Sequence, residues 1–212
     1  MVLLFVFSLI GVLLLLPLHF LSVEHTKLDA RYGKDKGKRV GSVLGIISGW
    51  GYFIFLFGIW LAPQEKFNLP VFDQEILLIG DWFSISGIDL LLGMLFILPG
   101  MWFGIKGVTD LGLEVSETHR AEKVIKSGVY SRVRHPQYLG AMLAHIGITM
   151  LLSQLFALIV TPIIMLRDFV ACRKEERELV REFGTEYEEY RKQVPMLLPR
   201  LREKGSEMEA IQ

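Results

Sequence analysis

The sequence predicts an all-α integral membrane protein with about five transmembrane helices. Of its 212 residues, 51% are hydrophobic, and the mean hydropathy is +0.40. This chain is too apolar for an ordinary water-soluble domain and long enough for several spans. Apolar stretches recur along it at about 1–22, 41–62, 85–105, 138–152 and 155–170. The lysines and arginines gather in alternate connections between these stretches, as is typical of multi-pass proteins.

The first apolar stretch starts at the N-terminus, where a secretory signal would lie. It has no basic residue ahead of it and no small-residue cleavage site near Ser22, so we expect a retained first helix. Small residues recur at four-residue spacing in three of the later stretches, which predicts close helix packing within the membrane. They are Gly41, Gly45 and Gly49 in the second, Gly100 and Gly104 in the third, and Gly140 and Ala144 in the fourth.

The last two apolar stretches are separated only by Ser153 and Gln154, which predicts a tight helical hairpin. Each is shorter than the roughly 20 residues that cross about 30 Å of hydrocarbon, so a partly crossing pair stays possible. The second continues directly into a charged C-terminal helical tail. Gly184 predicts the end of that helix, and Thr185 with Glu188 predicts a capping box that starts another short one.

The distribution of charge predicts the orientation. All but one of the 23 lysines and arginines, Lys66, lie in residues 23–40, in residues 106–137, or from Arg167 onward. With five spans these segments share one side, which the positive-inside rule makes the cytosol, and the N-terminus lies outside. The formal net charge is zero and no basic tract is interleaved with aromatic residues, so we expect no nucleic-acid partner.

Cys172 is the one cysteine, so no intrachain disulfide and no cysteine-based metal cluster can form, and we expect no metal site. Motifs of familiar soluble enzymes are also absent from the sequence. We therefore divide the chain into an N-terminal three-span region, residues 1–110, and a core, residues 111–212. The core holds a cytosolic loop, the helical hairpin and the C-terminal helices.

The segment SRVRHPQYLG, residues 131–140, carries the first candidate site. Pro136 suits the first turn of a helix, whose unpaired N–H groups would face Arg134 and His135 and favour an anionic ligand. The alternative is that Arg134 reaches toward lipid head groups and His135 merely caps the helix.

The adjacent carboxylates Glu175 and Glu176 are the second candidate, with solvated helix charge as the alternative. Because the hairpin turn has two residues, the cytosolic ends of its helices must lie together. We therefore expect Arg134 and His135 near Glu175, in one pocket with cationic and anionic walls.

These two segments resemble a known family. GVYSRVRHPQYLG followed by EERELVREFGTEYEEYRKQVPMLLP, within about residues 122–200, is similar to the isoprenylcysteine carboxyl methyltransferases, membrane enzymes related to phospholipid methyltransferases. The resemblance implies S-adenosyl-L-methionine as methyl donor, bound on the cytosolic side. It also implies a lipidic or prenylated acceptor that enters from the bilayer, most directly an isoprenylcysteine carboxylate.

The resemblance further implies which residues contact the cofactor: Val124, Ile125, Tyr130, His135, Pro136, Gln137, Tyr138 and Glu175. An ionised carboxylate acceptor needs no base, so alignment and desolvation carry the reaction, with an arginine to orient the acceptor. The family places that arginine one turn before the first Glu of the pair, where this chain has Ala171, with Arg167 one turn earlier. Our catalytic candidates are therefore Glu175, Arg173 and Arg134.

Three other functions remain open. A phospholipid or another small amphiphile could be the acceptor, and an amine would need a base such as Glu175 or His135. An NADPH-dependent sterol reductase has a similar tail, with Arg167, Asp168 and Cys172 at matching spacing, but here Phe183 and Gly184 follow Cys172 by eleven residues rather than four. A non-catalytic membrane scaffold with the same fold is the third alternative.

Overall fold

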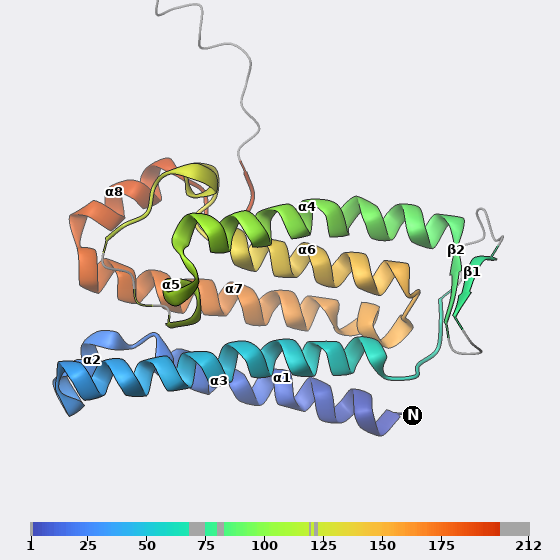
Figure 1. Cartoon of the computed structure of the whole chain (residues 1–212), viewed down its shortest axis with the longest axis horizontal. Coiled ribbons are helices and arrows are strands. Elements are labelled where there is room, and N and C mark those ends of the chain that lie inside the picture. Colours follow the sequence, from blue (N-terminus) through green and yellow to red (C-terminus); the bar gives the residue numbers. More distant parts are fainter. Residues whose placement is uncertain (1, 68–74, 80–82, 119, 121–122, 200–212) are drawn as a thin grey trace, which may run out of the picture.

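A computed structural model describes residues 2–67, 75–79, 83–118, 120 and 123–199. Long helices run side by side along one axis, and short elements cover the ends (Figure 1). The short helices α2 (His25–Tyr32), α5 (Leu113–Thr118) and α8 (Thr185–Gln193) lie at one end, here called the α8 end. A β-hairpin lies at the opposite end, here called the strand end.

Among the described residues, four helices are long and apolar enough to cross a membrane: α1 (Val2–Ser22), α3 (Lys34–Leu61), α4 (Gly87–Leu111) and α7 (Leu155–Phe183). Large apolar side chains stand exposed along them, such as Leu14, Ile54 and Leu95 at 67%, 66% and 62%. Lipid accommodates such surfaces, whereas water does not. The chain is thus a multi-pass membrane protein. Helix α6 (Pro136–Leu151) has 16 residues, so the fifth crossing stays a prediction.

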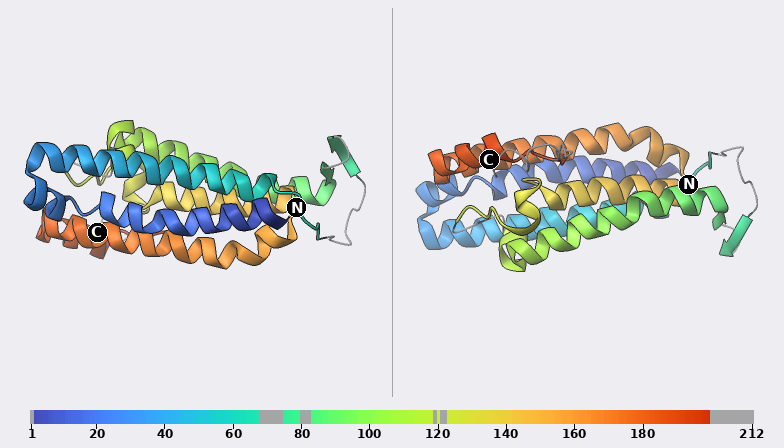
Figure 2. Two further views of the ribbon diagram at one scale, coloured as in Figure 1. Left: turned by 90° about the horizontal axis from the view of Figure 1, so that it is seen from below. Right: turned by 90° about the horizontal axis from the view of Figure 1, so that it is seen from above.

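The helices form two closely packed groups. Helix α1 lies between α3 and α7 (Figure 2), and α4 lies along α6. In the second pair the small residues bring the backbones together, since a Cβ added at Gly140 would lie 2.6 Å from the Gly104 nitrogen. The predicted small-residue packing is confirmed there. The domain boundary at residue 110 stays a prediction.

The predicted helical hairpin is confirmed. Helix α6 ends at Leu151 and α7 begins at Leu155, with Ser153 in the left-handed region at φ 51°. The turn is held by the segment after α3, because the Phe67 N–H donates to the Ser153 carbonyl at 2.9 Å. Helix α7 then runs unbroken to the α8 end and includes the charged stretch, as expected.

Two local features differ from the predictions. Gly184, at φ 56°, ends α7 as expected, but it also directly precedes α8, whose first residue is Thr185. The predicted capping box is wrong, because one left-handed glycine joins the two helices and leaves no separate capping position. The short antiparallel pair β1 (Glu75–Ile79) and β2 (Phe83–Ser86) was not predicted by the helical pattern.

Candidate active site

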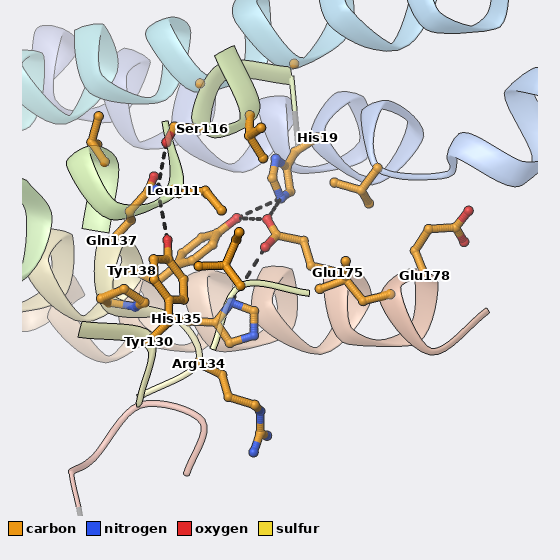
Figure 3. A pocket seen from close by; sticks show the side chains of 18 of the residues that line it. His19, Leu111, Ser116, Tyr130, Arg134, His135, Gln137, Tyr138, Glu175 and Glu178 are labelled. Carbon is orange, nitrogen blue, oxygen red and sulfur yellow. Dashed lines mark hydrogen bonds and ion pairs between the residues drawn. The ribbon is translucent and has the colours of Figure 1, made fainter. Parts of the chain in front are cut away.

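A cavity of about 400 Å³ opens at the α8 end. This volume is typical of a small-molecule site. Residues from all the long helices and from α2, α5 and α8 line it. Both sequence candidates reach it: Arg134 and His135 from the segment before α6, and Glu175 from α7 (Figure 3).

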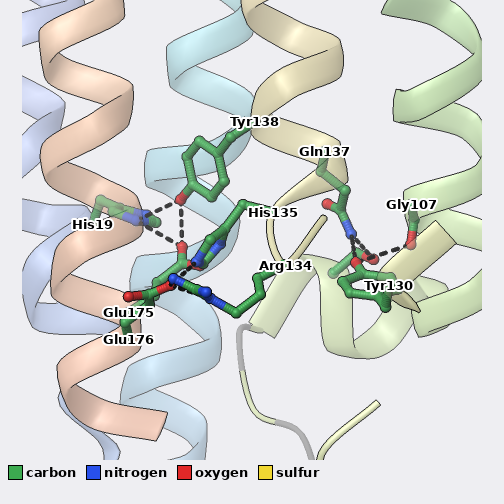
Figure 4. Close-up of polar contacts among 10 residues, drawn as sticks. His19, Gly107, Tyr130, Arg134, His135, Gln137, Tyr138, Glu175 and Glu176 are labelled. Carbon is green, nitrogen blue, oxygen red and sulfur yellow. Dashed lines mark hydrogen bonds and ion pairs between the residues drawn. The ribbon is translucent and has the colours of Figure 1, made fainter. Parts of the chain in front are cut away.

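The Glu175 carboxylate is the centre of the polar wall. The Tyr138 hydroxyl donates to its Oε1, and His19 Nε2 lies 3.2 Å from Oε1 and 2.9 Å from the Tyr138 hydroxyl. His135 Nδ1 approaches the other oxygen at 3.6 Å. Three elements therefore meet at one carboxylate (Figure 4). The expectation that the two-residue turn brings His135 close to Glu175 is confirmed.

A second polar group lies toward α4, around Tyr130 of the short helix η1 (Gly128–Ser131). Its hydroxyl donates to the Gly107 carbonyl at 3.2 Å, while Gln137 Nε2 donates to that hydroxyl at 3.3 Å and to Ser116 Oγ at 2.9 Å (Figure 4). Burial raises the pKa of Tyr130 well above its usual value, so this phenol stays a donor at all physiological pH values. The group ties the first turn of α6 to α4 and α5.

The start of α6 follows the expected pattern, with Pro136 as its first residue. His135 precedes the helix, yet its side chain makes no capping hydrogen bond and instead faces the glutamates. The backbone N–H groups of Arg134 and His135 donate to the carbonyls of Pro195 and Met196 at 2.9 and 3.0 Å. The segment after α8 thereby fixes the entry into α6.

Arg134 is fully engaged in structural contacts. Its Nε lies 2.6 Å from Oε1 of Glu176, and its Nη1 donates to the carbonyls of Arg191 and Val194. Figure 3 shows its guanidinium turned away from Tyr138 and Glu175. The side chain is 8% exposed and that of Glu176 is 3% exposed. The ion pair joins the segment before α6 to α7, and the two carbonyl hydrogen bonds hold the end of α8 there, so the guanidinium is not available to an acceptor.

Arg173 is not brought to the cavity. It is exposed, and its guanidinium lies 5.3 Å from the Phe169 ring. Two residues along a helix turn the side chain by about 200°, so a position two before Glu175 faces away from it. The arrangement therefore gives no support to Arg173 as the residue that orients an acceptor.

Val124 and Ile125 line the cavity as the resemblance implied. Val124 packs on a small apolar cluster made by Tyr187, Tyr190 and Val194. The Tyr190 hydroxyl donates to the Tyr130 carbonyl at 2.6 Å, which fixes α8 over the site. All the residues expected to contact a cofactor thus surround one space, on its polar and apolar sides.

Residues of the N-terminal helices complete the site and were missed by the motif analysis. They are His19 from α1, His25 from α2 and Tyr52 from α3. His19 had a usable signal, because an ionisable residue within an apolar stretch is a functional candidate. Among the described residues, no group of three metal-binding side chains is placed to hold an ion.

Comparison with known proteins agrees with this site. A model of the phospholipid methyltransferase family matches residues 88–186. Over 85 residues, 40% of this chain and 36% of the relative, the chain is 33% identical to the protein-S-isoprenylcysteine O-methyltransferase of Schizosaccharomyces pombe. The Saccharomyces cerevisiae enzyme of the same name is 31% identical over 114 residues, 51% of this chain and 48% of the relative.

The segment that carries both sequence motifs is therefore similar to the phospholipid methyltransferase family and to the isoprenylcysteine O-methyltransferases. A further relative of similar sequence is methanethiol S-methyltransferase 2 of Bradyrhizobium diazoefficiens, 45% identical over 75 residues, 34% of this chain and 27% of the relative. The chain spans less than half the length of each of these relatives. No solved structure matches the chain.

Proposed function

We propose that the protein is an S-adenosyl-L-methionine-dependent methyltransferase that acts on a lipidic acceptor at the cytosolic face of a membrane. The acceptor that this site suits best is the carboxylate of an isoprenylcysteine-like molecule. One observation carries the proposal: both sequence motifs, together with α1, converge on Glu175 in a cavity large enough for a small molecule.

The residues present fit the cofactor chemically. Glu175 offers a carboxylate to an ammonium or to hydroxyl groups, and the first turn of α6 offers backbone N–H groups to a carboxylate. Val124 and Ile125 offer an apolar wall to a flat aromatic base. Tyr130, His135, Pro136, Gln137 and Tyr138 complete the surrounding set. When bound, the cofactor supplies a sulfonium methyl group that is already activated.

The protein's part in the reaction is then to position the two reacting groups and to exclude water from them. An ionised carboxylate has no proton that must be removed. It would form a C–O bond to the methyl carbon while the C–S bond breaks, and the electron pair of the C–S bond would stay on sulfur. Helix α5 is held over the cavity by the contact of Ser116 with Gln137. This cover removes water from the reacting groups and holds them in line.

The orientation follows from charge. Nearly all the lysines and arginines of the described residues lie in or beside the short helices and the helix ends at the α8 end, whereas Lys66 pairs with Gln154 in the turn between α6 and α7. By the positive-inside rule the α8 end with its cavity faces the cytosol, and five crossings put the N-terminus outside.

An acceptor that must lose a proton, a thiol or an amine, is the second candidate. The observation in its favour is His19, which lies 3.2 Å from Glu175 and 2.9 Å from the Tyr138 hydroxyl. A histidine and a carboxylate so close can take up a proton from a neutral nucleophile.

The test is calorimetric titration of the detergent-purified protein with S-adenosylhomocysteine, the demethylated product. We expect saturable binding that is lost in His135→Ala and Glu175→Gln. Glu189→Gln, at an exposed carboxylate on α8, is the matched control and should bind like the wild type. Absence of binding by the folded wild type would refute the proposal and make NADPH, the cofactor of the reductase alternative, the next titrant.

A further inference from the structure

The cavity is elongated along α7. Helix α7 lines it from Arg167 to Glu182, a distance of about 22 Å at 1.5 Å per residue. Glu175, at the centre of the proposed cofactor site, lies about halfway along this length, eight residues or about 12 Å from Arg167. The end away from α8 is formed by Arg167 together with an apolar stretch of α3 that includes Gly49, Trp50 and Phe53. These two ends have different chemistry, which suits two different ligands.

Arg167 is the cation of the apolar end. The residue is 5% exposed, and its Nη1 donates to Oδ1 of Asp168 at 2.8 Å. Its guanidinium carbon lies 4.0 Å from the centre of the Tyr52 ring, and the Tyr52 hydroxyl donates to the other Asp168 oxygen at 3.1 Å. One residue of α3 and two of α7 thus form a closed group that fixes the plane of the guanidinium.

One hydrogen-bond donor of this group is left without a partner among the described residues. This donor is the buried Nε of Arg167. A buried donor without a partner costs free energy, and an ion pair at membrane depth is less favourable than a well-packed apolar pair. A purely structural link between α3 and α7 would not need an arginine that lines a cavity and leaves its buried Nε unpaired among the described residues.

The space next to Arg167 suits an apolar chain. A Cβ added at Gly49 would meet no atom within 4 Å, so this face of α3 is open toward the cavity. The exposed rings of Trp50 and Phe53 on the same helix extend the apolar surface outward. A ligand with a long hydrocarbon tail can therefore reach Arg167 from the lipid side of α3.

We propose that Arg167 binds the anionic head group of the acceptor, a carboxylate attached to a hydrocarbon chain. The unused edge of the guanidinium, at Nε, faces the ligand, while Asp168 and Tyr52 hold its plane. This inference rests on the proposed function, because it assigns the acceptor end of the same cavity. It also gives the orienting role to an arginine inside the cavity, whereas Arg134 is engaged and Arg173 lies outside.

The test compares two neutral-tailed probes that differ only in the head group: N-acetyl-S-farnesylcysteine and its carboxamide. The anionic acid partitions into detergent less than the neutral amide, so the partition of each probe is measured without protein and the affinities are corrected for it. The corrected ratio then reports the head group. Wild-type protein should prefer the acid at least tenfold, as expected for a charge-assisted hydrogen bond. In the double variant Arg167→Met with Asp168→Asn, which leaves no orphaned charge, the preference should vanish while affinity for the carboxamide is retained.

Two further binding measurements separate loss of the head-group contact from general loss of binding. S-adenosylhomocysteine should bind the double variant within twofold of the wild type, because Glu175, the centre of its proposed site, lies about 12 Å along α7 from Arg167. Arg167→Lys, which keeps the charge, should keep part of the preference for the acid. Equal affinity of the wild type for both probes would overturn the inference, and so would a double variant that loses both probes and the cofactor product together. Failure of the wild type to bind S-adenosylhomocysteine would instead refute the proposed function. The two failures can be told apart because the two probes are titrated in the absence of S-adenosylhomocysteine.

Discussion

Arg134→Ala tests the structural role that the fold gives to the motif arginine. The ion pair with Glu176 is buried, with side chains 8% and 3% exposed, and the guanidinium also serves two carbonyls near the end of α8. Removing one partner of a buried pair costs about 3–5 kcal/mol. For a chain of about 200 residues, 1 kcal/mol shifts the melting temperature by about 2–4 °C. We therefore expect the melting temperature to fall by about 6–20 °C.

The measurement is thermal unfolding in detergent, combined with hydrogen exchange of residues 185–199. Exchange in that segment should rise, because α8 loses its attachment. Arg132→Ala is the matched control, because this arginine lies in the same loop and is exposed. Among the described residues its side chain makes only a cation–π contact with Trp102 at 5.7 Å, which is worth about 1 kcal/mol or less. Adding Glu176→Ala to Arg134→Ala should recover part of the loss, since no orphaned carboxylate remains. An Arg134 variant that melts like the control, with α8 still protected, would refute the reasoning.

Three other changes test the packing, the buried phenols and the cavity. Gly140→Ala should lower the melting temperature by roughly 2–12 °C, because the new Cβ meets backbone at 2.6 Å at a cost of about 1–3 kcal/mol, whereas Gly104→Ala, with no atom within 4 Å, should not. Burial raises the pKa of Tyr130 and Tyr190, so above pH 10 only the unfolded chain ionises them, and each makes the free energy of unfolding fall by about 1.4 kcal/mol per pH unit. Unfolding titrations of Tyr130→Phe should therefore show a slope above pH 10 that is shallower than that of the wild type by this amount, with no difference between the two slopes at neutral pH. Gly49→Leu should weaken binding of N-acetyl-S-farnesylcysteine at least tenfold in calorimetry without lowering the melting temperature; full affinity would show that α3 does not border the acceptor space.

The helices could be predicted because each rests on a local property of the chain. The apolar runs, the two-residue turn at Ser153 and Gln154, and Gly184 after Phe183 are read directly from sequence. The capping box failed because it needs a residue outside both helices, and Gly184 occupies that place alone. The strands Glu75–Ile79 and Phe83–Ser86 are too short for their pattern to stand out beside the adjoining apolar helix.

The site was predictable where covalent geometry limits the distance. The short turn at residues 152–154 makes α6 and α7 antiparallel neighbours. His135 lies 16 residues before the end of α6 and Glu175 lies 20 residues after the start of α7, so their approach could be expected from the sequence. The sequence does not tell whether Arg134 pairs with Glu175 or with Glu176. That choice depends on the positions of the backbone carbonyls at the end of α8, to which Arg134 also donates. His19 could have been singled out as an ionisable residue in an apolar stretch, but its contact with Glu175 could not, since the packing of α1 between α3 and α7 has no signature in the motif.

The two ends of the cavity also differ in where their residues come from. The expected cofactor residues, Val124 to Glu175, lie inside the segment 88–186 that matches the family, while His19, Gly49 and Tyr52 lie outside it. Even Arg167, which lies inside, is held in plane by Tyr52 of α3. Relatives with this segment carry the names of both thiol and isoprenylcysteine methyltransferases, so a shared segment does not determine the acceptor. A common cofactor end combined with a separately built acceptor end accounts for that difference, and the acceptor of this protein is to be sought from the side chains of α1 and α3 rather than from the motifs.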